Sequence, residues 1–484
     1  MSSSSAPVPV RQTARASLLL LAYLAFISLG LPDGLLGVGW PSIRSEFTVP
    51  TEAVGLLLTS GTVGYLVSSV VAGFSIARLG VGWLLAGSTA LASLALAGYA
   101  ASPALPSMIG CALLLGLGSG AIDAGLNAYA ADAFGPRHMN WMHACFGLGV
   151  AAGPMIMTTV LGADLAWRWG YGIVAAAQAV LALAFVLTVG IWTRRPPAPA
   201  AAVPVSAPPD GSTVAAAAVR SPESSPGETL PPGSSPAASL PAGAPPGAPV
   251  VGPVGEEAAL AGGEPGLATE PRPAAPAAAE PVRIRETLTR PAVWFGAATF
   301  AVYVAVEVAA GLWAFLLLTT GRGMTPAAAG FCVSAYWGSL FLGRVAQGLL
   351  AERLGTRPVL LGGMVGMAVG SGLVAVPGPA WLAVTGLAVL GFAAAPVFPL
   401  LTLTTAERVG RRHADRAIGV QIAAAGLGGA LIPSGFGVLI GRASVEALGP
   451  ALLVASLVML ALHRASDRRG TAARRPGVRP DPAA

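Results

Sequence analysis

Long apolar runs separated by short polar loops dominate this chain. Each run is about 20 residues or longer, the length that a helix needs to cross a bilayer. Since backbone polar groups in hydrocarbon must be bonded within their own element, such runs predict membrane-spanning helices, and hence an all-α membrane protein. The twelve runs cover residues 17–40, 53–77, 80–101, 105–132, 140–163, 168–192, 291–319, 325–351, 357–377, 379–406, 416–441 and 445–464.

The twelve predicted helices fall into two groups of six, joined by a segment of different composition. Residues 193–282 contain 21 Pro and no aromatic residue. Such a segment cannot bury enough apolar surface to offset its ordering entropy, so we expect a disordered linker, with a docking or regulatory role as the alternative. The predicted division is a tail at 1–16, a six-helix half at 17–192, the linker at 193–290, a second half at 291–464 and a tail at 465–484.

Composition and charge agree with a membrane protein. Only 10% of the 484 residues are charged, against roughly 25% in soluble domains. All 28 basic residues are Arg, and with both termini cytoplasmic 23 of them lie on the cytoplasmic side and four on the outer side. This satisfies the positive-inside rule, so the net charge of +6 reflects topology and predicts no nucleic-acid partner. We expect a multi-pass monomer in the cell membrane with a cytoplasmic linker.

Motifs for redox, metal or phosphate chemistry do not emerge from the sequence. The cysteines lie singly inside apolar runs, which supports neither disulfides nor a thiolate metal site. The GLGSG run at 116–120 lies in mid-span and does not join a strand to a helix, so it predicts no phosphate loop. We therefore expect no cofactor, no metal and no enzymatic activity. The cysteines are Cys111, Cys145 and Cys332.

The two halves contain an internal repeat. Shifting the chain by 275 residues aligns 73–87 with 348–362, with six identities in fifteen positions. Because each half has an even number of spans, the repeats are expected to lie parallel, related by an axis along the membrane normal. The same shift pairs Gly116 with Gly391, Asp132 with Glu407, Gly135 with Gly410, Arg137 with Arg412 and His138 with His413.

The loop after the second helix of each half carries the pattern G-x-x-x-[DE]-R-x-G-x-R, which resembles the major facilitator superfamily. The resemblance implies that these loops, with the charged residues paired above, form cytoplasmic gates that hold helix ends by charge and helix dipoles. Ala77 and Gly82 replace two charged residues of the first copy, so we expect its latch to be weaker. The copies retain Gly73, Arg78 and Gly80 in the first half, and Gly348, Glu352, Arg353, Gly355 and Arg357 in the second.

Local stretches are also similar to the fucose permease branch of sugar/proton symporters. They are residues 30–43, 116–129 and 138–154, with 336–344 and 392–410 fitting the bacterial members. The resemblance implies alternating-access transport of a small polar solute such as a sugar, driven by protons, with sodium as an alternative. A drug or metabolite exporter and a non-transporting membrane sensor remain rival hypotheses.

Acidic residues inside the apolar runs are the strongest functional candidates. Insertion of a charged residue at the bilayer centre costs roughly 2.5 to 3.5 kcal/mol of free energy, so such a residue indicates a function. Asp33 follows Pro32 in the first run, and Asp123 shares a helical stripe with Gly116, Gly120 and Asn127, which predicts a face turned into the bundle. Acids on the first and fourth helices carry proton coupling in the resembled branch, which implies this role for Asp33 and Asp123. The alternative is that they only fix helix packing.

Further candidates surround the expected central cavity. Glu307 lies one residue from the repeat equivalent of Asp33, so we expect the two acids to face each other. His143 shares a face with Asn140, and its ring can bind a hydroxyl or titrate near neutral pH. Arg344 is expected to pair with a gate acid. The cavity candidates are Asn127, Asn140, His143, Tyr303, Glu307, Tyr336 and Trp337.

Overall fold

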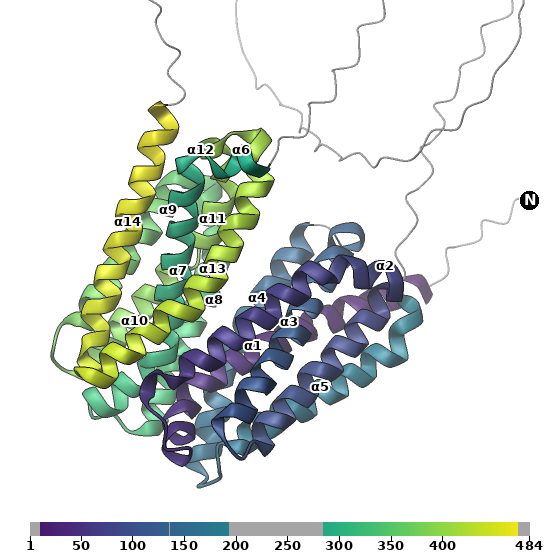
Figure 1. The fold of residues 1–484 in the computed structure, drawn as a ribbon, viewed down its shortest axis with the longest axis horizontal. Helices are drawn as coiled ribbons and strands as arrows, with labels where there is room; N and C mark the ends of the chain where they lie inside the picture. Colours follow the sequence, from purple (N-terminus) through teal and green to yellow (C-terminus); the bar gives the residue numbers. More distant parts are fainter. Residues whose placement is uncertain (1–9, 135, 193–283, 473–484) are drawn as a thin grey trace, which may run out of the picture. The chain divides into compact units, whose positions relative to one another are not determined.

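The computed structural model describes residues 10–134, 136–192 and 284–472, and within them every regular element is helical. The linker predicted at 193–290 and both tails lie largely outside the described residues. Figure 1 shows the helices as two groups, purple to blue and teal to yellow. We call the end of the helices where α1 begins and α5 ends the linker end, and the opposite end the far end.

The first half contains five helices and two short turns. Because α2 is broken in the middle, they provide six spans. The elements are α1 (Val10–Glu46), η1 (Thr51–Ala53), α2 (Val54–Ala101), α3 (Leu105–Ala133), α4 (Pro136–Gly162), α5 (Arg168–Thr188) and η2 (Val189–Ile191).

The second half repeats this order after a short helix at the linker end. One of its spans is divided between α10 and α11. The elements are α6 (Ile284–Leu288), α7 (Pro291–Leu316), η3 (Leu317–Gly321), α8 (Pro326–Leu354), α9 (Thr356–Ala375), α10 (Ala380–Ala394), α11 (Val397–Leu403), α12 (Thr405–Val409), η4 (Arg411–His413), α13 (Ala414–Arg442), η5 (Val445–Ala447) and α14 (Leu448–Ala472).

Two breaks explain how these helices give the twelve predicted spans. Ten helical segments of the described chain are long and apolar enough to cross a membrane. One of them, Thr51–Ala101, contains Gly80 at φ 75°, where no right-handed helix continues, so it makes two spans. Helix α8, which has 29 residues and is not among these ten, supplies the twelfth. The run predicted at 379–406 is interrupted at Pro396 and is not one helix.

The internal repeat is visible in the packing of the helices. In the first half α1 packs against α4 and α5, and in the second half α7 packs against α13 and α14. A side chain at Gly116 would run into the backbone of Gly61, and one at Gly391 would lie 2.6 Å from the carbonyl oxygen of Tyr336. Both partners are again 275 residues apart. The same small-residue contact therefore joins the second and fourth spans of each half.

Four pairs of elements make most of the contacts between the halves: α4 with α8, α2 with α13, α1 with α7, and η1 with α13. Their close approaches at glycines lie mainly toward the far end. A Cβ on Gly37 would lie 3.0 Å from the carbonyl oxygen of Leu312, and one on Gly55 would overlap Ser434. At the linker end, Gly80 and Gly355 are exposed. The contacts we identify thus close the far end.

Candidate functional site

Asp123 lies in the middle of α3, and two neutral donors hold its carboxylate. The hydroxyl of Tyr65 in α2 donates to Oδ2 at 2.7 Å, and Nδ2 of Asn127 donates to Oδ1 at 3.0 Å. The carboxylate is therefore oriented without being paired to a fixed cation. Oδ1 of Asn127 is buried and has no partner among the described residues, so it can accept a hydrogen bond from a bound molecule.

The glycines on the stripe explain why Asp123 faces α2. A side chain at Gly116 would meet Gly61, and one at Gly120 would meet Tyr65 and Ser68. These glycines let the α2 and α3 backbones approach closely, which brings the Tyr65 hydroxyl within reach of the acid. The prediction that this face points into the bundle is confirmed. Sequence offered no signal for Tyr65, which lies 58 residues from Asp123.

Arg344 of α8 reaches the other half of the protein. Its Nη1 donates to the carbonyl oxygen of His143 in α4 at 3.4 Å. The Arg344 charge also acts on the His143 ring and on Glu307 in α7. We expected Arg344 to pair with a gate acid, and this was wrong because α8 turns the residue toward α4 and α7.

Four polar side chains from the two halves form a series, which we call the polar bridge. It consists of Asp123, His143, Arg344 and Glu307, each in electrostatic range of the next. The His143 side chain is exposed, whereas the other three are half-buried. The half-buried Arg344 near Glu307 lowers the electrostatic cost of keeping a charge on that acid.

Two tyrosines of the second half contact Glu307. The hydroxyl of Tyr336 donates to its backbone carbonyl at 2.8 Å, and its carboxylate interacts with Tyr303. The Tyr303 hydroxyl also reaches the carbonyl of Ala394 at 3.2 Å. These contacts tie the seventh span to the eighth and tenth around the acid.

Asp33 does not join the polar bridge. Its side chain is exposed, and the titratable groups on which its charge acts include Tyr65, Tyr99 and Tyr171 of its own half. Pro32 does not interrupt α1, which runs unbroken past it. The expectation that Asp33 and Glu307 face each other across the central cavity stays a prediction.

The aromatic candidates are mostly packing residues, which corrects our prediction of a cavity lining. Tyr303 and Tyr336 are 0% and 1% exposed, and their hydroxyls bond backbone carbonyls. Neither presents a face to a solute here. Trp337 is half-buried and packs against Gly311, where a Cβ would overlap the indole ring.

The gate loops share an unusual backbone conformation. Gly80 and Gly355 have φ of 75° and 83°, and Gly410 has φ of 87°. Side chains disfavour this region, which explains why both copies of the loop motif keep the glycine. Gly73 and Arg78 are exposed, as are Arg353 and Arg412.

An ion pair fastens the gate of the second half. Nη2 of Arg357 in α9 lies 2.7 Å from Oε2 of Glu407 in α12. The first half has Gly82 at the position of Arg357. Both partners of the pair are well exposed, so it contributes little on its own.

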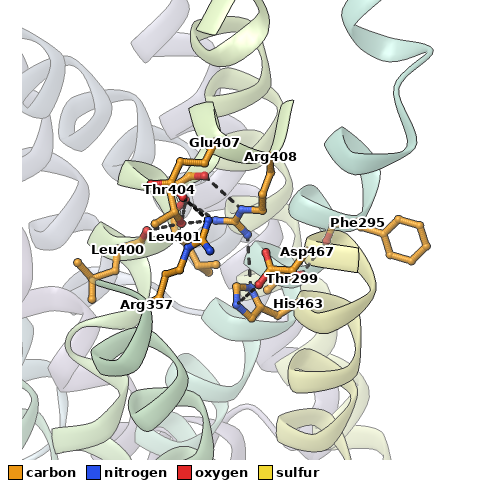
Figure 2. Close-up of polar contacts among 10 residues, drawn as sticks. All are labelled: Phe295, Thr299, Arg357, Leu400, Leu401, Thr404, Glu407, Arg408, His463 and Asp467. Atoms are coloured by element: carbon orange, nitrogen blue, oxygen red, sulfur yellow. Dashed lines mark hydrogen bonds and ion pairs between the residues drawn. The ribbon is translucent and has the colours of Figure 1, made fainter. Parts of the chain in front are cut away.

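Beside this pair lies a polar cluster that the sequence did not predict (Figure 2). Arg408 donates to the carbonyl of Leu401 at 3.0 Å and to the hydroxyl of Thr404, both at the C-terminal end of α11. Its Nη1 lies 3.4 Å from Nδ1 of His463, whose Nε2 lies 3.4 Å from Oδ2 of Asp467. Burial lowers the pKa of the Arg408 guanidinium, and the charge of Asp467 opposes this. The i, i+4 spacing of His463 and Asp467 was the available signal.

Five predicted side chains lie outside the part of the chain whose side chains are described. In the described residues no group of three or more His, Cys, Asp or Glu side chains could hold a metal ion. The five are Asp132, Arg137, Asn140, Gly348 and Glu352.

Comparison with known proteins supports a membrane transporter. The curated 3-(3-hydroxy-phenyl)propionate transporter of Escherichia coli (strain K12) is 28% identical over 159 residues, 32% of this chain and 40% of the relative. The chain thus matches less than half of that relative. A mutant of the nucleoside transporter NupG superposes with a TM-score of 0.64 at 14% identity, covering 93% of this chain and 99% of that one. A bacterial homolog of the human lysosomal transporter Spinster, in an inward-facing and occupied conformation, gives 0.60 at 14% identity, covering 99% and 100%.

The family itself is given by a sequence model. The Major Facilitator Superfamily model matches residues 22–433 and 295–481, which together include both six-helix halves. The structural neighbours share this fold at low sequence identity. The chain therefore belongs to the Major Facilitator Superfamily of membrane transporters.

Proposed function

We propose that this protein is a proton-coupled transporter of a small polar solute, such as a sugar, which works by alternating access in the cell membrane. The linker end is cytoplasmic in this proposal, as the Arg distribution predicts. The observation that carries it is the Asp123 carboxylate, held in mid-span by Tyr65 and Asn127 and free of a fixed counter-ion. In this proposal Asp123 carries the coupling proton.

The polar bridge supports coupling between protonation and movement of the halves. Arg344 belongs to one half and donates to a carbonyl of the other, so its contacts must change when the halves rock. A proton that neutralises Asp123 or Glu307 changes the charge balance around Arg344. With the linker end cytoplasmic, closure of the far end is the inward-facing state of this proposed cycle. Asp33 is proposed as an assisting acid on the strength of the family-branch resemblance.

A carboxylate-bearing solute is a second candidate. The guanidinium of Arg344 can bind a carboxylate through two N–H donors. The partial match to a transporter of 3-(3-hydroxy-phenyl)propionate agrees with this choice. A sugar and an aromatic acid are distinguished by which one raises the unfolding temperature of the purified protein, since only a ligand of the native state does so.

The test is uptake into proteoliposomes under an imposed proton gradient. We expect Asp123→Asn to abolish accumulation while exchange of solute across the membrane continues, because the neutral amide mimics a protonated acid. Asp164→Asn is the matched control, since Asp164 is an exposed acid in a far-end loop. Unchanged accumulation in Asp123→Asn would overturn proton coupling through this residue.

The same assay separates the rival functions. A sodium-coupled protein accumulates solute with a sodium gradient alone. An exporter gives resistance to a sensitive host and shows no growth on the solute. Absence of transport for every solute, together with loss of phenotype on deletion of 200–280, would favour a membrane sensor.

A further inference from the structure

A dense set of arginines gathers at the linker end of the second half, around α6 and η4. Figure 1 places α6 and α12, which directly precedes η4, at the same end of this half. We call this set the basic face. It consists of Arg285, Arg290, Arg411, Arg412 and Arg416.

Specific contacts bring these arginines together. Oγ1 of Thr287 in α6 lies 2.9 Å from Nδ1 of His413 in η4, both buried. Nη1 of Arg290 donates to the carbonyl of Val409 at 3.2 Å. The charges of Arg290, Arg412 and Arg416 all act on His413, so they lie around one point.

The basic face is not neutralised by the described protein. Its charged neighbours Glu286 and Asp415 are exposed and supply two negative charges against five positive ones. No ion pair within 4.0 Å joins an arginine of this face to an acid of the described ranges. Arg285, Arg290, Arg411 and Arg412 are exposed. An excess of like charge that is held in place and open to solvent favours binding of an anion.

Exposed apolar side chains border the same face. Ile284 is 60% exposed and Trp294 is 55% exposed. The indole N–H of Trp294 donates to the carbonyl of Leu288 at 2.7 Å, which holds the ring beside α6. Trp294 lies in the first turn of the span Pro291–Gly321, the level at which tryptophan meets lipid headgroups. Charge and apolar surface therefore meet at the membrane–water boundary.

We propose that the basic face binds the anionic headgroups of the leaflet at the linker end, with Ile284 and Trp294 inserted among the lipids beside it. A bilayer surface supplies both required chemistries, phosphate anions and an apolar interior, at the level where α6 lies. Free phosphate supplies only the first. The proposal depends on the membrane-spanning fold and not on the transported solute.

Titration of phosphatidylglycerol into the full-length protein in neutral detergent tests this, with the unfolding temperature as the readout. The variant carries Arg285→Gln, Arg411→Gln and Arg412→Gln, which leaves the Arg290 contact intact. We expect each removed charge to weaken the apparent lipid affinity about fivefold, or about 1 kcal/mol. The wild-type stabilisation should fall with added salt, and inorganic phosphate should not reproduce it.

Two controls keep the test decisive. Arg442→Gln removes one exposed arginine at the far end and should leave the lipid response unchanged. Replacement of the same three arginines by Lys keeps the charges and should restore most of the response, which separates lost charge from misfolding. The proposal is overturned if the Gln variant keeps the full response, if the Lys variant loses it too, or if phosphate alone gives the same stabilisation. Asp123→Asn should keep the response, so failure of proton coupling is distinguishable from failure here.

Discussion

Trp192 and Asp467 occupy the same position in the two repeats, 275 residues apart. Each connects the same pair of helices of its own half, Trp192 by aromatic packing and Asp467 by polar contacts. The Trp192 ring packs 4.9 Å from that of Tyr129, and its N–H donates to Thr188. Asp467 bonds His463, which contacts Arg408. Tyr129 and Thr188 are the repeat partners of Thr404 and His463. The first half thus has an aromatic contact at the site where the second half has a polar contact.

These two contacts should respond differently to mutation and to salt. We expect Trp192→Ala to cost about 3 to 5 kcal/mol, independent of salt, because the side chain is 2% exposed. Asp467→Ala should cost at most about 1 kcal/mol, and less in high salt, because its side chain is 52% exposed. Thermal unfolding in detergent at low and high salt measures both. Equal losses of unfolding free energy with the same salt dependence would contradict the difference between an aromatic and a polar contact.

At the far end Arg322 holds several elements of the second half together. Its side chain is 2% exposed and lies 2.8 Å from Glu446, while it donates to the carbonyls of Val376 and Gly378 beyond α9. Arg322→Gln should cost about 3 kcal/mol because it leaves these acceptors and the carboxylate without a partner. Arg442→Gln, at an exposed site of the same end, should cost under about 0.5 kcal/mol. A similar unfolding temperature for the two variants would show that the Arg322 network is not stabilising.

The contact of α2 with α3 should depend on a glycine. Gly116→Val should destabilise the protein by about 1 to 3 kcal/mol or more, because its side chain would overlap the backbone of Gly61. Uptake should fall as well, since the shift separates Tyr65 from Asp123. Gly110→Val is the matched control on the same helix, because nothing lies within 4 Å of its Cβ. If both variants unfold at the same temperature, close packing at Gly116 is not important.

Locking the far end should stop transport. A Cβ at Gly441 in α13 would lie 3.7 Å from the Cβ of Thr51 in η1 of the other half, a separation that fits a disulfide, so the pair Gly441→Cys and Thr51→Cys should form one on oxidation. Cys111, Cys145 and Cys332 must first be replaced, because all three are free thiols. Oxidised proteoliposomes should lose uptake and recover it on reduction. Uptake that persists in the cross-linked protein would mean that the far end need not open.

The sequence predicted more of the fold than of the site. The number of spans followed from run length, because hydrocarbon permits only elements that bond their own backbone. The bounds shifted by several residues, as in α1, which extends to Glu46. The stripe around Asp123 also followed from spacing alone. Arg344 did not, because spacing says which residues share a face and not which other helix that face meets.

The sequence by itself determined the twelve apolar spans, the repeat and the acid at Asp123, because length, periodicity and charge are local properties of the chain. Tertiary structure decided that Tyr65 is the partner of Asp123, that Arg344 reaches His143, and that Tyr303 and Tyr336 are buried. Helices this uniformly apolar carry little information about their rotation, so their side-chain partners depend on how glycines let neighbouring backbones approach.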